Sequence, residues 1–145
     1  MQVDIHQRIA EVPPDEWNRL NRDATPFLTH EFLHAAETSG SVSAATGWAP
    51  RHLALRDGSG RLVAAMPLYE KTHSWGEFVF DWAWARAYEQ AGLDYYPKLV
   101  SAVPFTPATS RRLLCGDGED EQSPALLLEH ALRLARDSAQ SSLHV

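Results

Sequence analysis

The chain has 145 residues, of which 44% are hydrophobic and 22% are charged, and its net charge at pH 7 is −6. This length and composition are typical of one folded domain and exclude a disordered chain. The acidic balance argues against DNA, RNA or an anionic membrane as the main partner, and no window approaches the roughly 18 apolar residues of a membrane span.

The first forty residues predict a strand and two short helices. The chain begins MQVDIHQRIAEVPP, which contains no apolar signal-peptide core, and residues 2–9 alternate well enough for a strand. A short helix is expected from Asp15 to Asn21, before the break at Thr25-Pro26. Thr29 is a suitable N-cap for a second helix that runs to about Ser39 and stops at Gly40.

The rest of the chain mixes strands and helices. A hairpin is expected from strands 51–57 and 61–70 around Asp57-Gly58-Ser59-Gly60, with Pro67 indicating an edge position or a bulge. Further elements are a helix over about 81–91, a strand over 96–105, an acidic turn-rich segment over 115–122, a helix from Ser123-Pro124 and a final strand in SSLHV. The single Cys115 excludes an internal disulfide and fits a reducing cytoplasm.

This element order predicts the fold class. The central hairpin is antiparallel, whereas the last strand arrives through a helix, so the expected fold is a mixed α/β sandwich. No glycine-rich nucleotide-binding motif is present, which excludes a doubly wound nucleotide fold.

The pentad His30-Glu31-Phe32-Leu33-His34 matches the zinc-protease pattern H-E-x-x-H. Two histidines four apart on a helix can hold zinc while the glutamate acts as a base, which makes a zinc hydrolase one alternative. A helical projection, however, places His30, His34 and Glu37 opposite the apolar side, so we expect these side chains to face solvent and no metal to be bound.

Aromatic and acidic side chains gather between residues 73 and 84 (His73, Trp75, Glu77, Asp81, Trp82 and Trp84). One interpretation is a concave site whose aromatic walls raise the pKa of Glu77 or Asp81 for general-base work. The other is an aromatic-rich core helix in which Trp82 and Trp84 pack and Asp81 is the N-cap; we favour it for these three residues.

The stretch YYPKLVSAVPFTPATSRRL (95–113) also suggests a binding site. Pro104 and Pro107 each remove a backbone donor, so the strand is expected to splay away from a neighbour. Arg111 and Arg112 follow where they could bind phosphates. The alternative is an edge strand that ends in two solvated arginines.

Residues 26–114, and above all HSWGEFVFDWAW, YYPKL and VPFTP, resemble the FemAB-like predicted N-acyltransferases, a bacterial branch of the GNAT superfamily associated with peptidoglycan biosynthesis. The resemblance implies a GNAT-like fold of mostly antiparallel sheet flanked by helices, with the splayed strand beside an acyl-CoA slot. It also implies transfer of an acyl or aminoacyl group to an amine, from acyl-CoA or aminoacyl-tRNA as the donor. The acceptor would be a small molecule or a peptidoglycan precursor, and no cofactor would be tightly bound.

The resemblance also suggests roles for residues. Glu77 or Asp81 would be the base and Tyr96 would lie near the leaving group. The acceptor would contact Tyr69, His73, Trp75 and Lys98, and the donor would contact Phe105, Thr106, Arg111 and Arg112.

Two departures limit these expectations. The GNAT phosphate-binding turn is replaced by TSRRLLCGDGEDEQSP, and family chains are longer, with two GNAT-like halves. We therefore expect residues 1–145 to be a first half that lacks a C-terminal GNAT half or forms a homodimer. The competing interpretation is a non-catalytic acceptor-binding or dimerisation domain.

Overall fold

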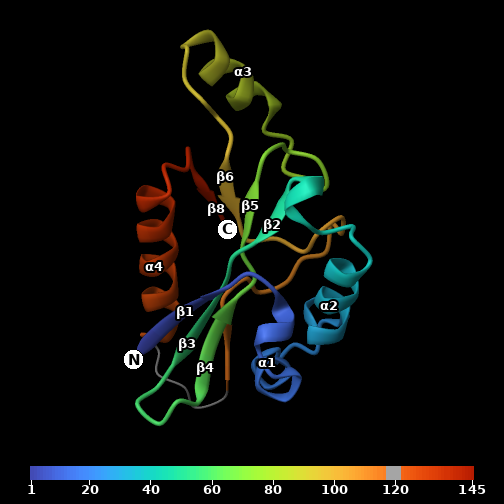
Figure 1. Ribbon diagram of the computed structural model, residues 1–145, viewed down its shortest axis with the longest axis vertical. Coiled ribbons are helices and arrows are strands. Elements are labelled where there is room, and N and C mark those ends of the chain that lie inside the picture. Colours follow the sequence, from blue (N-terminus) through green and yellow to red (C-terminus); the bar gives the residue numbers. More distant parts are fainter. Residues whose placement is uncertain (117–121) are drawn as a thin grey trace.

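The computed structural model describes residues 1–116 and 122–145. Its centre is one long β-hairpin that passes through two sheets (Figure 1). The first arm consists of β2 (Trp48–Pro50) and β3 (His52–Arg56), and the second of β4 (Leu62–Met66) and β5 (Tyr69–Lys71). The arms pair antiparallel in both sheets, with Leu53 opposite Met66 in one and Trp48 opposite Lys71 in the other. The predicted hairpin is confirmed.

Pro67 marks the break between the two sheets. Neither β4 nor β5 is an edge strand, since β4 lies between β3 and β7 and β5 lies between β2 and β6, so the expectation of an edge or a bulge at Pro67 is wrong. Proline has no N–H for a ladder hydrogen bond, and the pairing stops there. The adjacent Leu68 keeps its backbone bonded, because its N–H donates to Nδ1 of His52 at 3.3 Å and its carbonyl accepts from the N–H of Arg51 at 2.8 Å.

The remaining strands complete two four-stranded sheets, in the orders β1-β3-β4-β7 and β2-β5-β6-β8. Their bounds are β1 (Gln2–His6), β6 (Lys98–Val100), β7 (Leu114–Cys115) and β8 (Leu143–His144). All pairings are antiparallel except that of β8, which joins β6 in parallel. The predicted final strand, reached through a helix, is thus present.

The strand expected over 96–105 is shorter, because β6 ends at Val100 opposite Tyr69. The neighbouring strand offers no further ladder there, since it breaks at Pro67. Ser101 instead donates its hydroxyl to the Pro67 carbonyl at 2.6 Å, and the chain then leaves the sheet. The departure therefore begins before Pro104 and is caused by the proline on the other strand.

Helices cover both faces of the sheet that contains β3 and β4 (Figure 1). The helical segments are η1 (Ile9–Glu11), α1 (Pro14–Leu20), η2 (Pro26–Leu28), α2 (His30–Thr38), η3 (Ala44–Thr46), α3 (Trp82–Gln90) and α4 (Ser123–Asp137). Side chains alternate along β3, so Ala54 joins the core under α1 and α2, whereas Leu53 and Leu55 join the core under α4. The result is a three-layer, mixed α/β fold, as the sequence predicted at the level of class.

Helix α3 stands away from this body (Figure 1), and none of its side chains is buried. Trp84 is 67% exposed, so the expectation that it packs in a core is wrong; Trp82 is partly covered and lies 4.9 Å from Trp75 between ring centroids. One face of α3 is half-covered, at Trp82, Ala85 and Tyr88, and Trp84 lies off that face.

The HEFLH pentad opens α2, and Thr29 caps the helix by accepting a hydrogen bond from the N–H of Phe32 at 3.2 Å. His30 is buried, and its Nε2 lies 3.0 Å from the Ile9 carbonyl. Glu37 is also largely buried, accepting from the N–H of Ile9 and lying 2.9 Å from Nε2 of His52. The expectation that His30 and Glu37 face solvent is wrong, because η1 packs against that side of α2.

No group of three or more His, Cys, Asp or Glu side chains in 1–116 and 122–145 is arranged to hold a metal ion. Within the same residues, no helix has the length and apolar character needed to span a membrane. The acidic turn expected over 115–122 lies largely in 117–121, outside the described residues.

Candidate functional site

Two lysines face each other in the sheet that contains β5 and β6. Lys71 and Lys98 are directly opposite in the antiparallel register, so their side chains project on the same face. Both side chains are fully buried, with no exposed area. Two adjacent buried cations are costly unless carboxylates and hydrogen-bond acceptors surround them. The segment between β5 and α3 supplies these groups.

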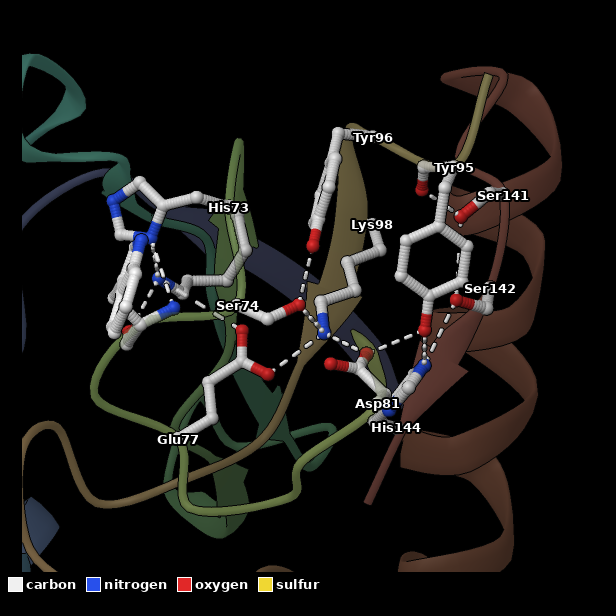
Figure 2. Close-up of polar contacts among 12 residues, drawn as sticks. His73, Ser74, Glu77, Asp81, Tyr95, Tyr96, Lys98, Ser141, Ser142 and His144 are labelled. Carbon is white, nitrogen blue, oxygen red and sulfur yellow. Dashed lines mark hydrogen bonds and ion pairs between the residues drawn. The ribbon is translucent and has the colours of Figure 1, made fainter. Parts of the chain in front are cut away.

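The ammonium group of Lys98 uses all three of its protons (Figure 2). It donates to Oγ of Ser74 at 3.1 Å, to Oε2 of Glu77 at 2.7 Å and to Oδ2 of Asp81 at 2.5 Å. The arrangement is that of a satisfied buried cation, held by two charge-assisted hydrogen bonds and one neutral one.

Lys71 lies on the other side of Glu77. Its Nζ is 3.8 Å from Oε1 of Glu77, donates to the carbonyl of Trp75 at 3.1 Å and stands 3.9 Å from the centre of the Trp48 ring. Burial lowers the pKa of Lys71 to about 8, although the charge of Glu77 partly opposes this effect. Glu77 therefore bridges the two lysines, through a hydrogen bond to Lys98 and a longer ion pair to Lys71.

His73 is held in one tautomer. Its Nε2 is 2.7 Å from the carbonyl of Thr46, which can only accept, so the proton of the neutral ring is on Nε2. Nδ1 then accepts from the N–H of Trp75 at 3.1 Å and from Lys71 at 3.3 Å. His73 thus orients Lys71.

The segment that carries these side chains folds back tightly at Gly76. Gly76 has a φ of +81°, and a Cβ there would lie 2.6 Å from Cδ1 of Phe105. Its carbonyl also accepts from the N–H of Phe105 at 3.0 Å. A glycine is therefore required at the turn that directs Glu77 inward.

Asp81 is a fixed counter-ion of the cluster. Its carboxylate accepts from Lys98 and from the hydroxyl of Tyr95, each at 2.5 Å. Burial alone would raise the pKa of Asp81, but these two hydrogen bonds and others together outweigh it and bring the pKa to about 2. Asp81 is the N-cap residue of α3, as the packing interpretation expected, but its side chain makes no capping hydrogen bond.

Glu77 differs from Asp81. Its burial raises the pKa above the ordinary value, in spite of the hydrogen bond and charge of Lys98. Its Oε1 is buried and has no hydrogen-bond donor within the described residues. Glu77 is thus the carboxylate of this cluster with both a free acceptor atom and increased basicity.

A line of hydrogen bonds joins Glu77 to a surface cavity. Oε2 of Glu77 accepts from Lys98, Lys98 also donates to Ser74, and Oγ of Ser74 lies 2.6 Å from the hydroxyl of Tyr96 (Figure 2). Tyr96 lines a cavity of about 610 Å³ between α3 and residues 92–96. The polar cluster therefore reaches this cavity through the tyrosine.

A second pair of cavities lies beside Glu77, where the chain leaves the sheet after β6. Their volumes are about 450 and 370 Å³, and Glu77, Ala102 and Arg112 line both. The guanidinium of Arg112 donates to the carbonyls of Ser110 at 3.2 Å and Ala108 at 3.3 Å, and to the Ser110 hydroxyl. No carboxylate of the described residues pairs with it, and burial lowers its pKa. It is a partly buried cation available to an anion.

The structure brings some of the expected site residues together and separates others. The buried cluster contains Glu77, Asp81, His73, Lys98 and, through Ser74, Tyr96. Trp75 contributes its backbone, while its side chain is 67% exposed. Tyr69 lies in the core with Trp48 and His52 instead.

The four expected donor contacts are also dispersed. Thr106 and Arg112 line one of the cavities beside Glu77. Phe105 packs on Trp48 with ring centroids 5.3 Å apart, and Arg111 is an exposed residue paired with Asp23 at 3.0 Å. The two arginines therefore do not lie together in one phosphate-binding site.

Sequence reasoning missed Lys71, Ser74, Tyr95 and His144. Lys71 ends the mostly apolar run LVAAMPLYEK, and it lies two residues after Tyr69 on the same face of the strand, which was a usable signal that it points inward. His144, on β8, lies 3.5 Å from the Tyr95 hydroxyl and 2.9 Å from Oγ of Ser142. That position follows only from the parallel pairing of β8 with β6, which no local pattern predicts.

The fold and the site define a three-layer α/β protein in which a buried cluster of two lysines and two carboxylates lies between surface cavities. The FemAB-like family, described as peptidoglycan biosynthesis/recognition, matches residues 8–145, and the chain belongs to this family. The family resemblance in HSWGEFVFDWAW and the stretches around it is thus confirmed. Searches among curated proteins and among solved structures find no match.

Proposed function

We propose that this chain takes part in transfer of an acyl or aminoacyl group to an amine of a peptidoglycan precursor, as a GNAT-like half whose general base is Glu77. Membership of a peptidoglycan biosynthesis/recognition family supports the substrate class and a transferase. The observation that carries the proposal is the state of Glu77, a buried carboxylate that lines two cavities, has a raised pKa, and whose Oε1 accepts no hydrogen bond and faces Lys71 at 3.8 Å.

The choice of Glu77 over Asp81 follows from basicity. A general base is most effective when its pKa lies near the working pH. The pKa of Asp81 is about 2, and both Lys98 and Tyr95 occupy its Oδ2, so it is a weak base. Each carboxylate has one oxygen without a hydrogen-bond donor, Oε1 of Glu77 and Oδ1 of Asp81, so the choice rests on the pKa, which burial raises for Glu77.

The reaction requires a neutral amine. Its nitrogen attacks the acyl carbonyl carbon, the new C–N bond forms, and the thioester or ester bond to the donor breaks. Glu77 accepts the proton that the nitrogen loses, and the leaving thiolate or alkoxide gains one. The line Glu77–Lys98–Ser74–Tyr96 connects a proton taken at Glu77 with the tyrosine that we propose near the leaving group.

Arg112 is the residue that we propose for the donor. It lines the cavities next to Glu77 and has only neutral partners, which suits a phosphate of acyl-CoA or of aminoacyl-tRNA. Thr106 lies in the same cavity. Arg111 is turned to Asp23 and has no part in this contact.

The test is transfer of labelled acetyl from acetyl-CoA, and of labelled alanine from alanyl-tRNA, to a soluble peptidoglycan precursor that carries a free amine. Product is detected by mass spectrometry. Glu77→Gln keeps the size of the side chain and is expected to lower the rate about 100-fold or more, the usual contribution of a general base. Glu129→Gln, a matched change on the exposed face of α4, is the control. An unchanged rate in the Glu77 variant would refute its role as base.

A second candidate has an observation in its favour. The side chains of Glu77, Lys71 and Lys98 have no exposed area, which suits a scaffold that binds an acceptor without turning it over. Binding of the precursor with no transfer from either donor, even with excess protein, would favour this non-catalytic acceptor-binding domain.

A further inference from the structure

The cavity between α3 and residues 92–96 is lined by charges that have no partner within the described chain. Arg86 and Glu89 on α3 line it, as does Asp94 beyond the end of the helix. All three are exposed, and no hydrogen bond or ion pair joins any of their side chains to a described residue. One cavity thus holds one cation and two anions that have no partner among residues 1–116 and 122–145.

Other exposed charges with a partner in reach do pair. Arg133 pairs with Glu129 one turn away on α4 at 2.9 Å, and Arg61 pairs with Asp57 at 3.3 Å. Arg86 and Glu89 are three residues apart on α3, a spacing that permits an ion pair, yet they do not form one. Both charges therefore stay available on the same cavity wall.

The other walls are aromatic. Trp82, Tyr95 and Tyr96 line the cavity, and the rings of Tyr95 and Tyr96 are 5.0 Å apart between centroids. Aromatic faces attract organic cations, and ammonium groups are bound well where such faces and carboxylates meet. The volume of about 610 Å³ lies in the range of small-molecule sites.

From this combination we propose that the cavity binds a small zwitterion, with its ammonium group on the side of Glu89, Asp94 and the aromatic walls and its carboxylate on Arg86. The ligand class is an amine that carries its own carboxylate, such as an amino-acid residue. The binding follows from the lining of the cavity and is independent of the proposed transfer.

The probes are 6-aminohexanoate, which has both groups, 1,5-diaminopentane, which lacks the carboxylate, and hexanoate, which lacks the amine. Binding to the full chain is measured by NMR chemical-shift titration and calorimetry. We expect saturable binding of 6-aminohexanoate and weaker binding of the other two. Shifts should be confined to α3 and residues 92–96.

Variants separate the two ends of the ligand. Arg86→Met should weaken 6-aminohexanoate about fivefold or more and leave diaminopentane unchanged, whereas Glu89→Gln with Asp94→Asn should weaken both amines. Arg133→Met and Glu129→Gln on α4 are matched controls that should change neither affinity. All the replaced side chains are exposed, so the variants are expected to fold like the native chain, and their circular dichroism spectra test this.

The outcomes distinguish this site from the proposed reaction. Failure of 6-aminohexanoate to bind at 20 mM, or binding that the Arg86, Glu89 and Asp94 variants leave unchanged, overturns the site. Binding that the variants weaken as expected establishes it, whether or not the transfer assay detects product. Loss of transfer in Glu77→Gln with no effect of the cavity variants on binding or rate would support the reaction and refute the cavity.

Discussion

Replacement of Lys98 by methionine removes the one charge that both buried carboxylates share. Methionine keeps the length and most of the apolar contacts of the lysine stem, so the change is mainly electrostatic. Asp81 and Glu77 lose hydrogen bonds of 2.5 and 2.7 Å, and Ser74 loses one of 3.1 Å. Among the described residues of the cluster, Lys71, 3.8 Å from Glu77, is then the remaining cation that offsets the two negative charges.

The loss of stability in Lys98→Met can be estimated in two ways. Removal of one partner from a buried ion pair costs about 3–5 kcal/mol. The stranded Asp81 can also escape by taking up a proton, which at pH 7 costs about 4 kcal/mol for a carboxyl with an ordinary pKa near 3.9. The two estimates agree, so we expect a loss of about 3–5 kcal/mol at pH 7. For 145 residues this corresponds to a fall in Tm of about 10–16 °C.

The same reasoning predicts a pH dependence. In the native chain the pKa of Asp81 is about 2, so its contribution to stability is present above pH 4 and is lost as the pH falls toward 2. In Lys98→Met the carboxylate is destabilising, and protonation relieves that penalty as the pH falls toward 4. The difference in the free energy of unfolding between the two proteins should therefore shrink by more than half from pH 7 to pH 4.

The assay is urea unfolding followed by circular dichroism at both pH values, with Arg133→Met as the control. Arg133 belongs to an exposed pair, so its replacement should cost less than about 1 kcal/mol. A loss below 1 kcal/mol for Lys98→Met at pH 7, or an equal loss at both pH values, would show that Lys98 does not neutralise the carboxylates in the folded protein.

Two further changes test other parts of the structure. Because burial lowers the pKa of Lys71 to about 8, the unfolded chain binds its proton more tightly between pH 8 and about 10.4, and stability should rise with pH in that window. From pH 7 to 9.5 the native chain should gain about 2 kcal/mol relative to Lys71→Met in urea unfolding, and no relative gain would contradict the burial of a charged Lys71. Thr29→Ala removes the cap of α2 and should cost about 1 kcal/mol, with Thr29→Ser close to native; equal losses in both would argue against the hydroxyl as the cap.

Local signals predicted most of the elements. Thr29 as a cap, the hairpin around Asp57-Gly58-Ser59-Gly60 and the proline near the start of the helix at Ser123 each act within a few residues, and all three are present. The bounds of β6 were predicted poorly. The strand ends where the neighbouring strand breaks at Pro67, which precedes β5 and lies some thirty residues away along the chain.

The site was predictable in part. Glu77 and Asp81 could be picked out from the sequence because they are carboxylates within an aromatic-rich segment. Their different pKa values, however, depend on tertiary contacts, since Tyr95 and Lys98 both donate to Asp81. The pairing of Lys71 with Lys98 depends on the register of two strands, which short-range patterns do not encode. His30 was misplaced because its burial is due to η1, an element that precedes it by some twenty residues.

The hairpin that runs through both sheets has a consequence for how the protein opens. A strand that ended at Pro67 would let the β2-β5-β6-β8 sheet, with its buried lysines, unfold on its own. Here the bond from Arg51 to Leu68 and the bond from Ser101 to Pro67 join the two sheets across the break. Native-state hydrogen exchange should therefore show the amides of β3 and β5 protected by one shared opening event, as a single cooperative unit.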